Sequence, residues 1–480
     1  MIQAIAPEIG LLLLAGIVLV LDIAWSKNPE RRGKWLGWVT ALGLSAIMVV
    51  AITIARPPDV GSLEWGGMVR FDQAGFVFRL IFLCGAAVTA LFASQSEWLR
   101  HRGEFFALML VSTLGMNLMA SASDLILLFM AIETASLPLY VLAGFLIRDN
   151  RSVEAGLKYL LFGAITSAVM LYGFSLIYGF TGTTQLYQLD AAMQAAGIPN
   201  GLYALVMGLI LTGFGFKISA APFHFWAPDV YQGSPTPVAG FLSTASKAAG
   251  FAALLRVFQI AFSDQMAVWS ILFAAIATLS MLAGNYLALA QRSMKRLLAY
   301  SSIAQAGYML IGIAAGSPLG GVAVMYYLMA YLVTNLAAFG ILALVEKTVG
   351  SDDLSALAGL SRRSPGLAFG LLAALLSLGG IPPFAGFLAK LLVFASAVEQ
   401  GMVWLALVGI FNTVIGLYYY LNVLKIIYLN APSSPDRIRL DTPAWKISLV
   451  ICLAGILVLG FWFAPWYGLA EAAAGAIWIY

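Results

Sequence analysis

Continuous apolar segments, one after another along the chain, are the feature that most limits what this sequence can fold into. A run of about 20 apolar residues matches the length of a helix that crosses a lipid bilayer. Membrane barrels show a different pattern, because their strands alternate apolar and polar residues over about 10 positions. Charged residues make up only 10% of the chain, which is too few to cover a water-facing surface. The sequence therefore predicts an all-α integral membrane protein.

The apolar runs predict about 14 membrane spans within a single transmembrane domain over residues 1–480. No segment has the composition of a separate soluble domain. The predicted spans cover residues 8–25, 35–55, 74–93, 105–121, 124–147, 156–179, 201–221, 236–261, 267–290, 297–315, 321–346, 367–400, 403–429 and 444–466.

The distribution of Lys and Arg between the loops predicts the orientation of the spans, because cytoplasmic loops are enriched in these residues. One set of loops carries nearly all of them, whereas the opposite set holds Arg56 and Arg70. Both termini are then expected to face away from the cytoplasm. The loops assigned to the cytoplasm contain Lys27, Arg31, Arg32, Lys34, Arg100, Arg102, Arg148, Arg151, Arg292, Lys295, Arg296, Lys347, Arg362, Arg363, Arg437 and Arg439.

The sequence carries no motif for cofactor or nucleotide chemistry. The two cysteines, Cys84 and Cys452, are far apart, and each lies in an apolar run where free cysteine is commonly buried. No Cys/His cluster has the spacing of a metal site, and no glycine-rich phosphate loop is found. The net charge of +4 comes from loop residues and is better explained by membrane orientation than by nucleic-acid binding. We therefore expect no cofactor, metal or nucleic acid on this chain.

Two predicted spans contain residues that interrupt a helix: Pro222 in the seventh, and Pro382 with Pro383 in the twelfth. Proline lacks a backbone N–H and clashes with the preceding helical turn. In lipid, the freed carbonyls must be satisfied by protein or water. The two breaks lie five spans apart, so corresponding helices run in opposite directions, as in the inverted repeats of transporters. We predict two inverted five-helix repeats, at about 105–261 and about 267–429.

Four charged residues lie well inside their predicted spans or next to a break: Glu133, Lys217, Lys247 and Lys390. A charge at the centre of a membrane helix costs about 2.5–3.5 kcal/mol on insertion scales, so it needs a partner, water or a function. Burial disfavours a charged ammonium group, whereas a nearby carboxylate favours it. A movement of Glu133 would therefore change whether Lys217 holds its proton. We interpret the four residues as a proton relay.

The alternative is a static ion pair between Glu133 and Lys217 that locks two helices. Such a pair would stabilise the packing of the two helices only weakly, because the free-energy cost of removing both charges from water can outweigh their attraction. It would also leave Lys247 and Lys390 without an explanation.

Other charged residues have less distinctive surroundings. His224 lies at the first break, where its near-neutral proton affinity suits a relay, although a lone histidine is more often structural. Lys158 follows Glu154 by four residues, which is the spacing of a local helix pair, with a supporting role in the relay as the alternative. Three residues near span ends are interpreted as side chains that extend to the membrane surface: Asp22, Arg256 and Lys425.

Three stretches of the sequence resemble a known family. The stretch from Pro222 to Val238, PFHFWAPDVYQGSPTPV, resembles the signature of the antiporter-like membrane subunits of respiratory complex I, an NADH:quinone oxidoreductase. The stretches FLSTASK, from Phe241 to Lys247, and PPFAGFLAK, from Pro382 to Lys390, resemble the same family. The resemblance extends over essentially the whole chain.

The resemblance implies a fold of 14 helices with two inverted five-helix repeats and broken seventh and twelfth helices. It matches Glu133 to the glutamate of the fifth helix, Lys217 to the lysine of the seventh and Lys247 to the connecting lysine of the eighth. Lys390 matches the twelfth-helix residue of the far half-channel. It further implies proton translocation in a bacterial cytoplasmic membrane, driven by remote quinone reduction. Partner subunits would hold FMN and iron–sulfur clusters, and subunits K and M would be neighbours.

Three other functions remain open at this point. The same fold serves multisubunit cation/proton antiporters and membrane-bound hydrogenases. A second possibility is an autonomous secondary transporter for a small solute. A third is a scaffold subunit that transports nothing and contains only structural ion pairs.

Overall fold

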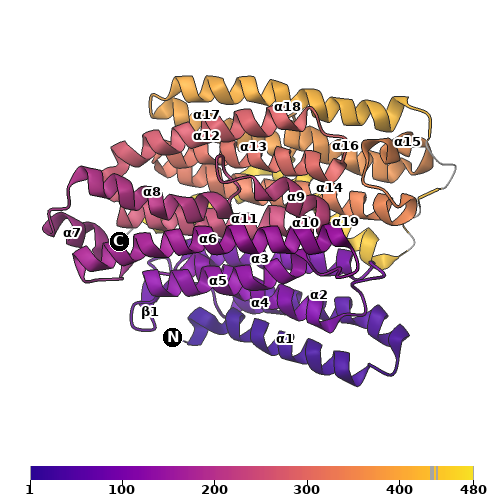
Figure 1. Ribbon diagram of the computed structural model, residues 1–480, viewed down its shortest axis with the longest axis horizontal. Coiled ribbons are helices and arrows are strands. Elements are labelled where there is room, and N and C mark those ends of the chain that lie inside the picture. Colours follow the sequence, from indigo (N-terminus) through magenta and orange to yellow (C-terminus); the bar gives the residue numbers. More distant parts are fainter. Residues whose placement is uncertain (1, 433–436, 439, 441, 479–480) are drawn as a thin grey trace.

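The computed structural model describes residues 2–432, 437, 438, 440 and 442–478, so Arg439 lies outside the described residues. Figure 1 shows long helices that run side by side, with α1 at one edge of the molecule and α18 at the opposite edge. The first half of the chain contains α1 (Ala6–Ala24), α2 (Pro29–Thr53), β1 (Ser62–Glu64), β2 (Val69–Phe71), α3 (Gln73–Ala93), α4 (Gly103–Ser121), α5 (Leu125–Ala143), α6 (Asn150–Thr181), α7 (Leu186–Ala195), α8 (Asn200–Lys217), α9 (Trp226–Gly233), α10 (Thr236–Phe241) and α11 (Lys247–Arg256). The second half contains α12 (Met266–Ala288), α13 (Met294–Ala315), α14 (Pro318–Val349), α15 (Leu360–Arg363), α16 (Pro365–Gly379), α17 (Ala385–Glu399), α18 (Val403–Leu429), α19 (Pro443–Phe461) and α20 (Phe463–Trp478).

Within the described residues, thirteen helices are long and apolar enough to cross a membrane. They confirm the predicted multi-span helical fold. The predicted twelfth span, 367–400, is occupied by two shorter helices, α16 and α17, which are separated by the second break. Each of these two helices has 15 residues and is too short to cross a bilayer alone.

The elements that were not predicted include a hairpin and two helices, α7 and α20, in addition to the short helices α9 and α15. β1 and β2 form a two-stranded antiparallel hairpin in the loop before α3. α7 is a 10-residue helix between α6 and α8, too short to be recognised as an apolar span. α20 follows α19 after a change of direction at Trp462 and packs against α3 and α14. The apolar pattern runs through this corner without interruption, so it could not reveal that one helix ends and another begins.

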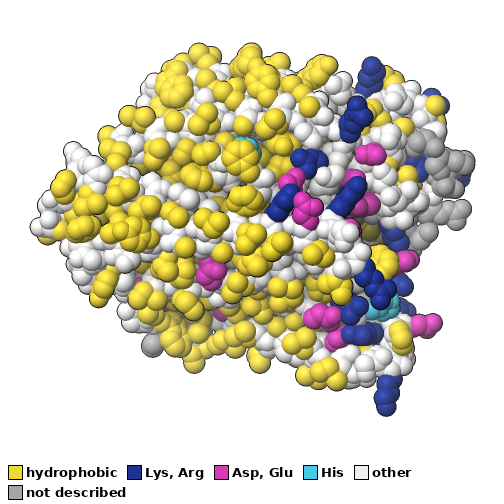
Figure 2. Space-filling model, in the orientation of Figure 1, with side chains coloured by type: hydrophobic (Ala, Val, Ile, Leu, Met, Phe, Trp, Pro, Cys, Tyr) yellow, Lys and Arg dark blue, Asp and Glu magenta, His cyan; other side chains and the backbone are white. Residues whose placement is uncertain are grey.

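Charged side chains gather at one end of the molecule. Figure 2 shows Lys and Arg concentrated at the right-hand end, while apolar side chains cover most of the remaining visible face. Both marked termini lie toward the opposite end in Figure 1. We refer to the end rich in Lys and Arg as the basic end.

Both breaks keep their backbone groups hydrogen-bonded through side chains. At the first break, the indole of Trp226 donates to the carbonyl of Phe216 at 3.1 Å. The hydroxyl of Ser280 on α12 accepts the N–H of Ala221 at 2.9 Å. At the second break, Gln305 on α13 donates to the carbonyl of Leu378 at 3.1 Å. This satisfies the requirement that irregular backbone at membrane depth finds partners inside the protein.

The eighth predicted span lies at the centre of the structure. Every residue from 233 to 262 is buried, although the segment is apolar enough to cross a membrane. It is not a regular helix: π-helical segments at Leu242–Ser246 and Val257–Ala261 flank α11. A π-helical turn is rare and often occurs at functional positions. Lys247, the first residue of α11, therefore lies next to irregular backbone in the core.

Arg256 does not extend to the membrane surface, so the interpretation from sequence was wrong. It is 2% exposed, and its guanidinium binds both carboxylate oxygens of Asp72, at 2.9 and 3.0 Å. It also donates to the carbonyl of Ala120 at 3.0 Å and the hydroxyl of Tyr187 at 3.1 Å. The span end that carries Arg256 is covered by α7 and by the start of α3, so this side chain cannot reach solvent.

The other two residues assigned to the membrane surface differ from one another. Asp22 forms an ion pair with Arg32 and accepts the N–H of Gly103 at 3.1 Å, so it ties α1 to the starts of α2 and α4. Lys425 is exposed. A further buried pair that was not predicted joins Glu8 of α1 to Arg79 of α3 at 2.8 Å.

Candidate functional site

Lys217 is the last residue of α8, directly before the first break, and is 6% exposed. The proline-containing segment after it ends the helix, so the side chain lies at a helix terminus inside the protein. Its ammonium group donates a hydrogen bond to the hydroxyl of Ser136 on α5. Ser136 in turn donates to the carbonyl of Ile132, one turn earlier. Lys217 is therefore held by a neutral hydroxyl group of a neighbouring helix.

Glu133 lies on α5, three residues before Ser136, the residue that accepts the hydrogen bond from Lys217. Oε1 of Glu133 is buried without a hydrogen-bond partner among the described residues. No ion pair of Glu133 occurs among those found in the described chain, so the static pair with Lys217 is absent from this structure. Glu133 therefore lies one helical turn from the hydrogen-bond partner of Lys217 and forms no ion pair with that lysine.

Lys247 is 1% exposed and binds α13. Its ammonium group donates to the backbone carbonyl of Ser302 at 2.7 Å and to the hydroxyl of the same residue at 2.5 Å. Both acceptors are neutral oxygens. A buried charge held only by neutral dipoles retains a larger desolvation cost than one paired with a carboxylate.

Lys390 lies in the second turn of α17, after the second break, and is 4% exposed. Its ammonium nitrogen lies 4.5 Å from the centroid of the Tyr308 ring. The negative face of an aromatic ring attracts a cation at this distance. Gly380 in the break has φ +77°, and a methyl group there would lie 2.9 Å from Cδ of Lys390. The lysine side chain thus folds back against the break.

One face of α13 connects the surroundings of Lys247 and Lys390. Ser302, Gln305 and Tyr308 follow one another at intervals of three residues, so each side chain lies next to the following one along the helix surface. Ser302 accepts a hydrogen bond from Lys247, and the ring of Tyr308 faces the ammonium group of Lys390. Six residues of helix rise by about 9 Å, so a short row of polar side chains separates the two lysines. Gln305, between them, accepts a hydrogen bond from the hydroxyl of Tyr327.

α8 and α11 approach each other closely between Lys217 and Lys247. Gly250 lies one turn after Lys247 on α11. A methyl group at Gly250 would lie 3.2 Å from Cβ of Lys217 and 2.9 Å from Cγ2 of Ile218. The absence of a side chain at Gly250 therefore allows the end of α8 to pack against the helix that begins with Lys247.

His224 lies within the first break and is 6% exposed. Its ring stacks on Phe225 with the centroids 4.5 Å apart, and Nδ1 has no hydrogen-bond partner within the described residues. The structure therefore places His224 near the break, as expected, but does not show it in direct contact with any of the three buried lysines.

Lys158 belongs to a charged group away from the buried lysines. It pairs with Glu154 at 2.7 Å, the helix pair expected from their spacing, and with Asp229 of α9 at 2.6 Å. Asp229 also binds Arg296 of α13 at 2.6 Å. These side chains are partly exposed, and the group joins α6, α9 and α13.

Several residues of the site were not singled out from the sequence: Ser136, Asp229, Arg296, Ser302, Gln305 and Tyr308. Asp229 is a charged residue inside the signature stretch, and that charge is the signal that could have identified it. Ser302 and Tyr308 are common residue types in an apolar helix. Only the fold reveals that Ser302 contacts Lys247, which lies 55 positions earlier in the chain. The same is true of the contact between Tyr308 and Lys390, which lies on a later helix.

Comparisons with known proteins show the family to which the chain belongs. The family model described as "NADH:quinone oxidoreductase/Mrp antiporter, TM" matches residues 122–416. NADH-quinone oxidoreductase subunit N of Moorella thermoacetica is 41% identical over 470 residues, which cover 97% of this chain and 95% of the relative.

Two solved structures extend the likeness to three dimensions. A chain of respiratory complex I from Thermus thermophilus with bound aureothin has a TM-score of 0.79 and 37% identity, covering 96% of this chain and 99% of that chain. A chain of the membrane-bound sulfane sulfur reductase, an archaeal respiratory membrane complex, has a TM-score of 0.86 and 25% identity, covering 99% and 98%. On this identity and coverage, the chain belongs to the subunit N family of NADH-quinone oxidoreductase, one of the antiporter-like membrane subunits that its sequence resembles.

Proposed function

We propose that this chain moves protons across a bacterial cytoplasmic (inner) membrane as part of an NADH:quinone oxidoreductase, a redox-driven translocase. The surroundings of the three buried lysines carry the proposal. Each ammonium group contacts a hydroxyl, a carbonyl or an aromatic ring instead of forming an ion pair with a carboxylate. Charges of this kind are costly in a membrane protein and commonly mark ion pathways.

In the proposed relay, protons are taken up near Lys217, pass Lys247 and leave through Lys390. The close approach of α8 and α11 at Gly250 supports transfer between the first two lysines. The face of α13 that carries Ser302, Gln305 and Tyr308 supports transfer to the third, because hydroxyl and amide groups can serve as intermediate hydrogen-bonding partners. Glu133 regulates Lys217, since movement of a carboxylate changes the stability of a nearby ammonium group.

His224 and Lys158 have supporting roles in this proposal. His224, in the first break, exchanges protons with the start of the relay, for which an imidazole is chemically suited. Lys158, with Asp229 and Arg296, forms a partly exposed charged group through which protons approach from the basic end. The proposal includes two inverted repeats, at about 105–261 and about 267–429, with Lys217 in the first and Lys390 in the second, and the spacing of the two breaks supports it.

Electron transfer takes place in partner subunits, which hold FMN and iron–sulfur clusters, and quinone reduction there drives the relay from a distance. Subunits K and M are the proposed neighbours of this chain in the membrane. The concentration of Lys and Arg at the basic end supports a cytoplasmic location for that end and a periplasmic location for both termini.

Native purification through an affinity tag on this chain tests the assignment. We expect to recover a large assembly that contains flavin and iron–sulfur clusters and that acidifies liposomes when NADH and a quinone are supplied. Recovery of the chain alone, with solute uptake by the isolated protein in liposomes, would show that it is an autonomous transporter.

Substitution of Gly250 by leucine is expected to reduce proton pumping by the assembled complex. The larger side chain would push the end of α8 away from α11 and separate Lys217 from Lys247; overpacking of this kind typically costs about 1–3 kcal/mol. Pumping is measured in liposomes, and assembly is checked on a native gel. Gly208→Leu, on α8 with open space around it, is the matched control. Equal pumping by the two variants would argue against transfer between α8 and α11.

A second candidate is a subunit of a multisubunit cation/proton antiporter or of a membrane-bound hydrogenase. The matched family model favours the antiporter alternative, because its description covers Mrp antiporters as well as NADH:quinone oxidoreductases. A tagged assembly without flavin, or one that exchanges Na⁺ for protons without an electron donor, would support this second candidate instead.

A further inference from the structure

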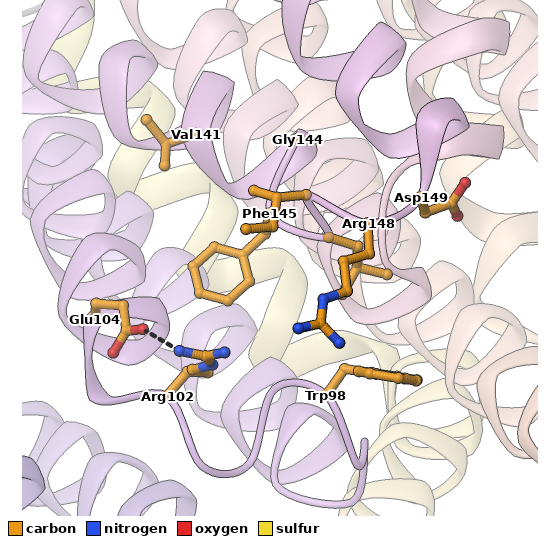
Figure 3. A pocket seen from close by; sticks show the side chains of 10 residues that line it. Trp98, Arg102, Glu104, Val141, Gly144, Phe145, Arg148 and Asp149 are labelled. Carbon is orange, nitrogen blue, oxygen red and sulfur yellow. Dashed lines mark hydrogen bonds and ion pairs between the residues drawn. The ribbon is translucent and has the colours of Figure 1, made fainter.

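A pocket of about 690 Å³ lies at the basic end, outside the buried lysine series. Its walls come from the loop between α3 and α4, the first turn of α4, the end of α5 and the loop that leads to α6. Figure 3 shows the side chains of Arg102 and Arg148 extending into the same space, with Phe145 above Arg102 and Trp98 below Arg148. None of these residues takes part in the proposed relay.

The polar side of the pocket carries the guanidinium groups of Arg102 and Arg148 together with the carboxylates of Glu104 and Asp149. Arg102 pairs with Glu104 at 3.4 Å, and both side chains are largely exposed, so this pair is weak and easily rearranged. Asp149 is engaged as the N-cap of α6, where it accepts the N–H of Arg151 at 2.9 Å. No hydrogen bond or ion pair of the Arg148 guanidinium is found in the part of the chain that the structure describes.

The other side of the pocket is apolar and open. Ile147 is 81% exposed and Val141 is 54% exposed. Trp98 is 68% exposed, and an exposed Trp beside basic residues is typical of the headgroup level of a membrane. The pocket therefore combines two guanidinium groups with an apolar wall at the end of a membrane-spanning helix.

We propose that this pocket binds one anionic phospholipid, with its phosphate between Arg102 and Arg148 and an acyl chain against Val141 and Phe145. Guanidinium groups bind phosphate oxygens through paired, charge-assisted hydrogen bonds. Basic pockets between membrane helices are recognised sites for anionic lipid headgroups. A phospholipid fits both sides of the pocket at once, because its phosphate would lie against the arginines while its acyl chain lies against the apolar wall. An acidic peptide would match the arginines but not the exposed apolar wall.

The test uses the complete assembly in liposomes that contain a phosphatidylglycerol with a photoreactive acyl chain. We expect labelled peptides from residues 141–147 of this chain. Labelling should fall about tenfold in the Arg102→Gln/Arg148→Gln double variant, because two basic contacts to an anionic lipid are lost. Arg362→Gln, which changes an exposed arginine of α15, is the matched control and should label as the wild type does. A photoreactive phosphatidylcholine, whose headgroup is neutral overall, should label this segment only weakly.

Three results would overturn the proposal. Equal labelling by the anionic and the neutral lipid, or labelling that persists in the double variant, would show that the arginines do not select a phosphate headgroup. A photoreactive amino acid at position 98 that crosslinks to a peptide of a partner subunit, with no lipid attached, would show that a protein occupies the pocket. Arg148→Lys provides a further check, since it keeps the charge and should retain part of the labelling.

Discussion

Lys247→Ala is expected to remove most NADH-driven proton pumping from the reconstituted assembly. Lys247 is 1% exposed and lies between the two breaks, where it contacts α13 through Ser302. Alanine cannot bind a proton, so the connection between Lys217 and Lys390 would be lost. We expect a loss of about tenfold or more, because a positioned proton-transfer group typically contributes about 10²–10⁴-fold to the step it serves.

Three comparisons make this result interpretable. Assembly is followed on a native gel, and pumping is measured in liposomes against the rate of NADH oxidation. Lys446→Ala removes an exposed lysine of α19 and should leave pumping unchanged. Ser302→Ala keeps the lysine but removes its hydroxyl acceptor, so it should cause a smaller loss. Normal assembly with unchanged pumping in Lys247→Ala would refute the relay and favour a scaffold role.

The second large effect concerns stability. Asp72→Ala is expected to lower the free energy of unfolding by about 3–5 kcal/mol, because it leaves the buried guanidinium of Arg256 without its countercharge. Asp72 is 1% exposed and binds Arg256 through both carboxylate oxygens. Loss of the pair would loosen the starts of α3 and α7 from the central buried span. The measurement is the thermal denaturation of the purified assembly.

Asp72 also caps α3 by accepting the N–H of Gly75 at 2.8 Å, so a second variant is needed to separate the two roles. Asp72→Asn keeps a good N-cap but removes the charge. This variant should be less destabilised than Asp72→Ala but still clearly less stable than the wild type. The double variant Asp72→Asn/Arg256→Leu should recover part of the loss, because an apolar replacement of a buried pair is often tolerated. Glu104→Ala, which breaks an exposed pair, should change stability by less than about 1 kcal/mol. A loss in Asp72→Ala as small as that of Glu104→Ala would contradict a structural role for the buried pair.

Local sequence patterns predicted the features that depend on local chemistry. Apolar length located the spans, since a helix in lipid must satisfy its own backbone over about 20 residues. Proline located the breaks after Lys217 and before Lys390, which the structure confirms at Ile218–Phe225 and at Gly380–Phe384. The same patterns could not find the corner at Trp462, because an apolar run does not record a change of direction.

The partners of the buried charges could not be predicted in this way. Arg256 was assigned to the membrane surface because it lies near a span end, but α7 and the start of α3 cover that end. Its partner, Asp72, is 184 positions earlier in the chain. Lys158 was expected to pair with Glu154, which it does, yet its second partner, Asp229, comes from another helix.

The sequence by itself determined that the chain is a bundle of membrane helices and that two of its helices are interrupted. These properties follow from the free-energy cost of exposing a charge or an unpaired backbone group to lipid. That cost depends on the residues of each segment by itself. The tertiary structure decided what the buried lysines contact: Ser136 for Lys217, Ser302 for Lys247 and the ring of Tyr308 for Lys390. Those contacts depend on which helix faces pack together, and packing is set by the whole chain.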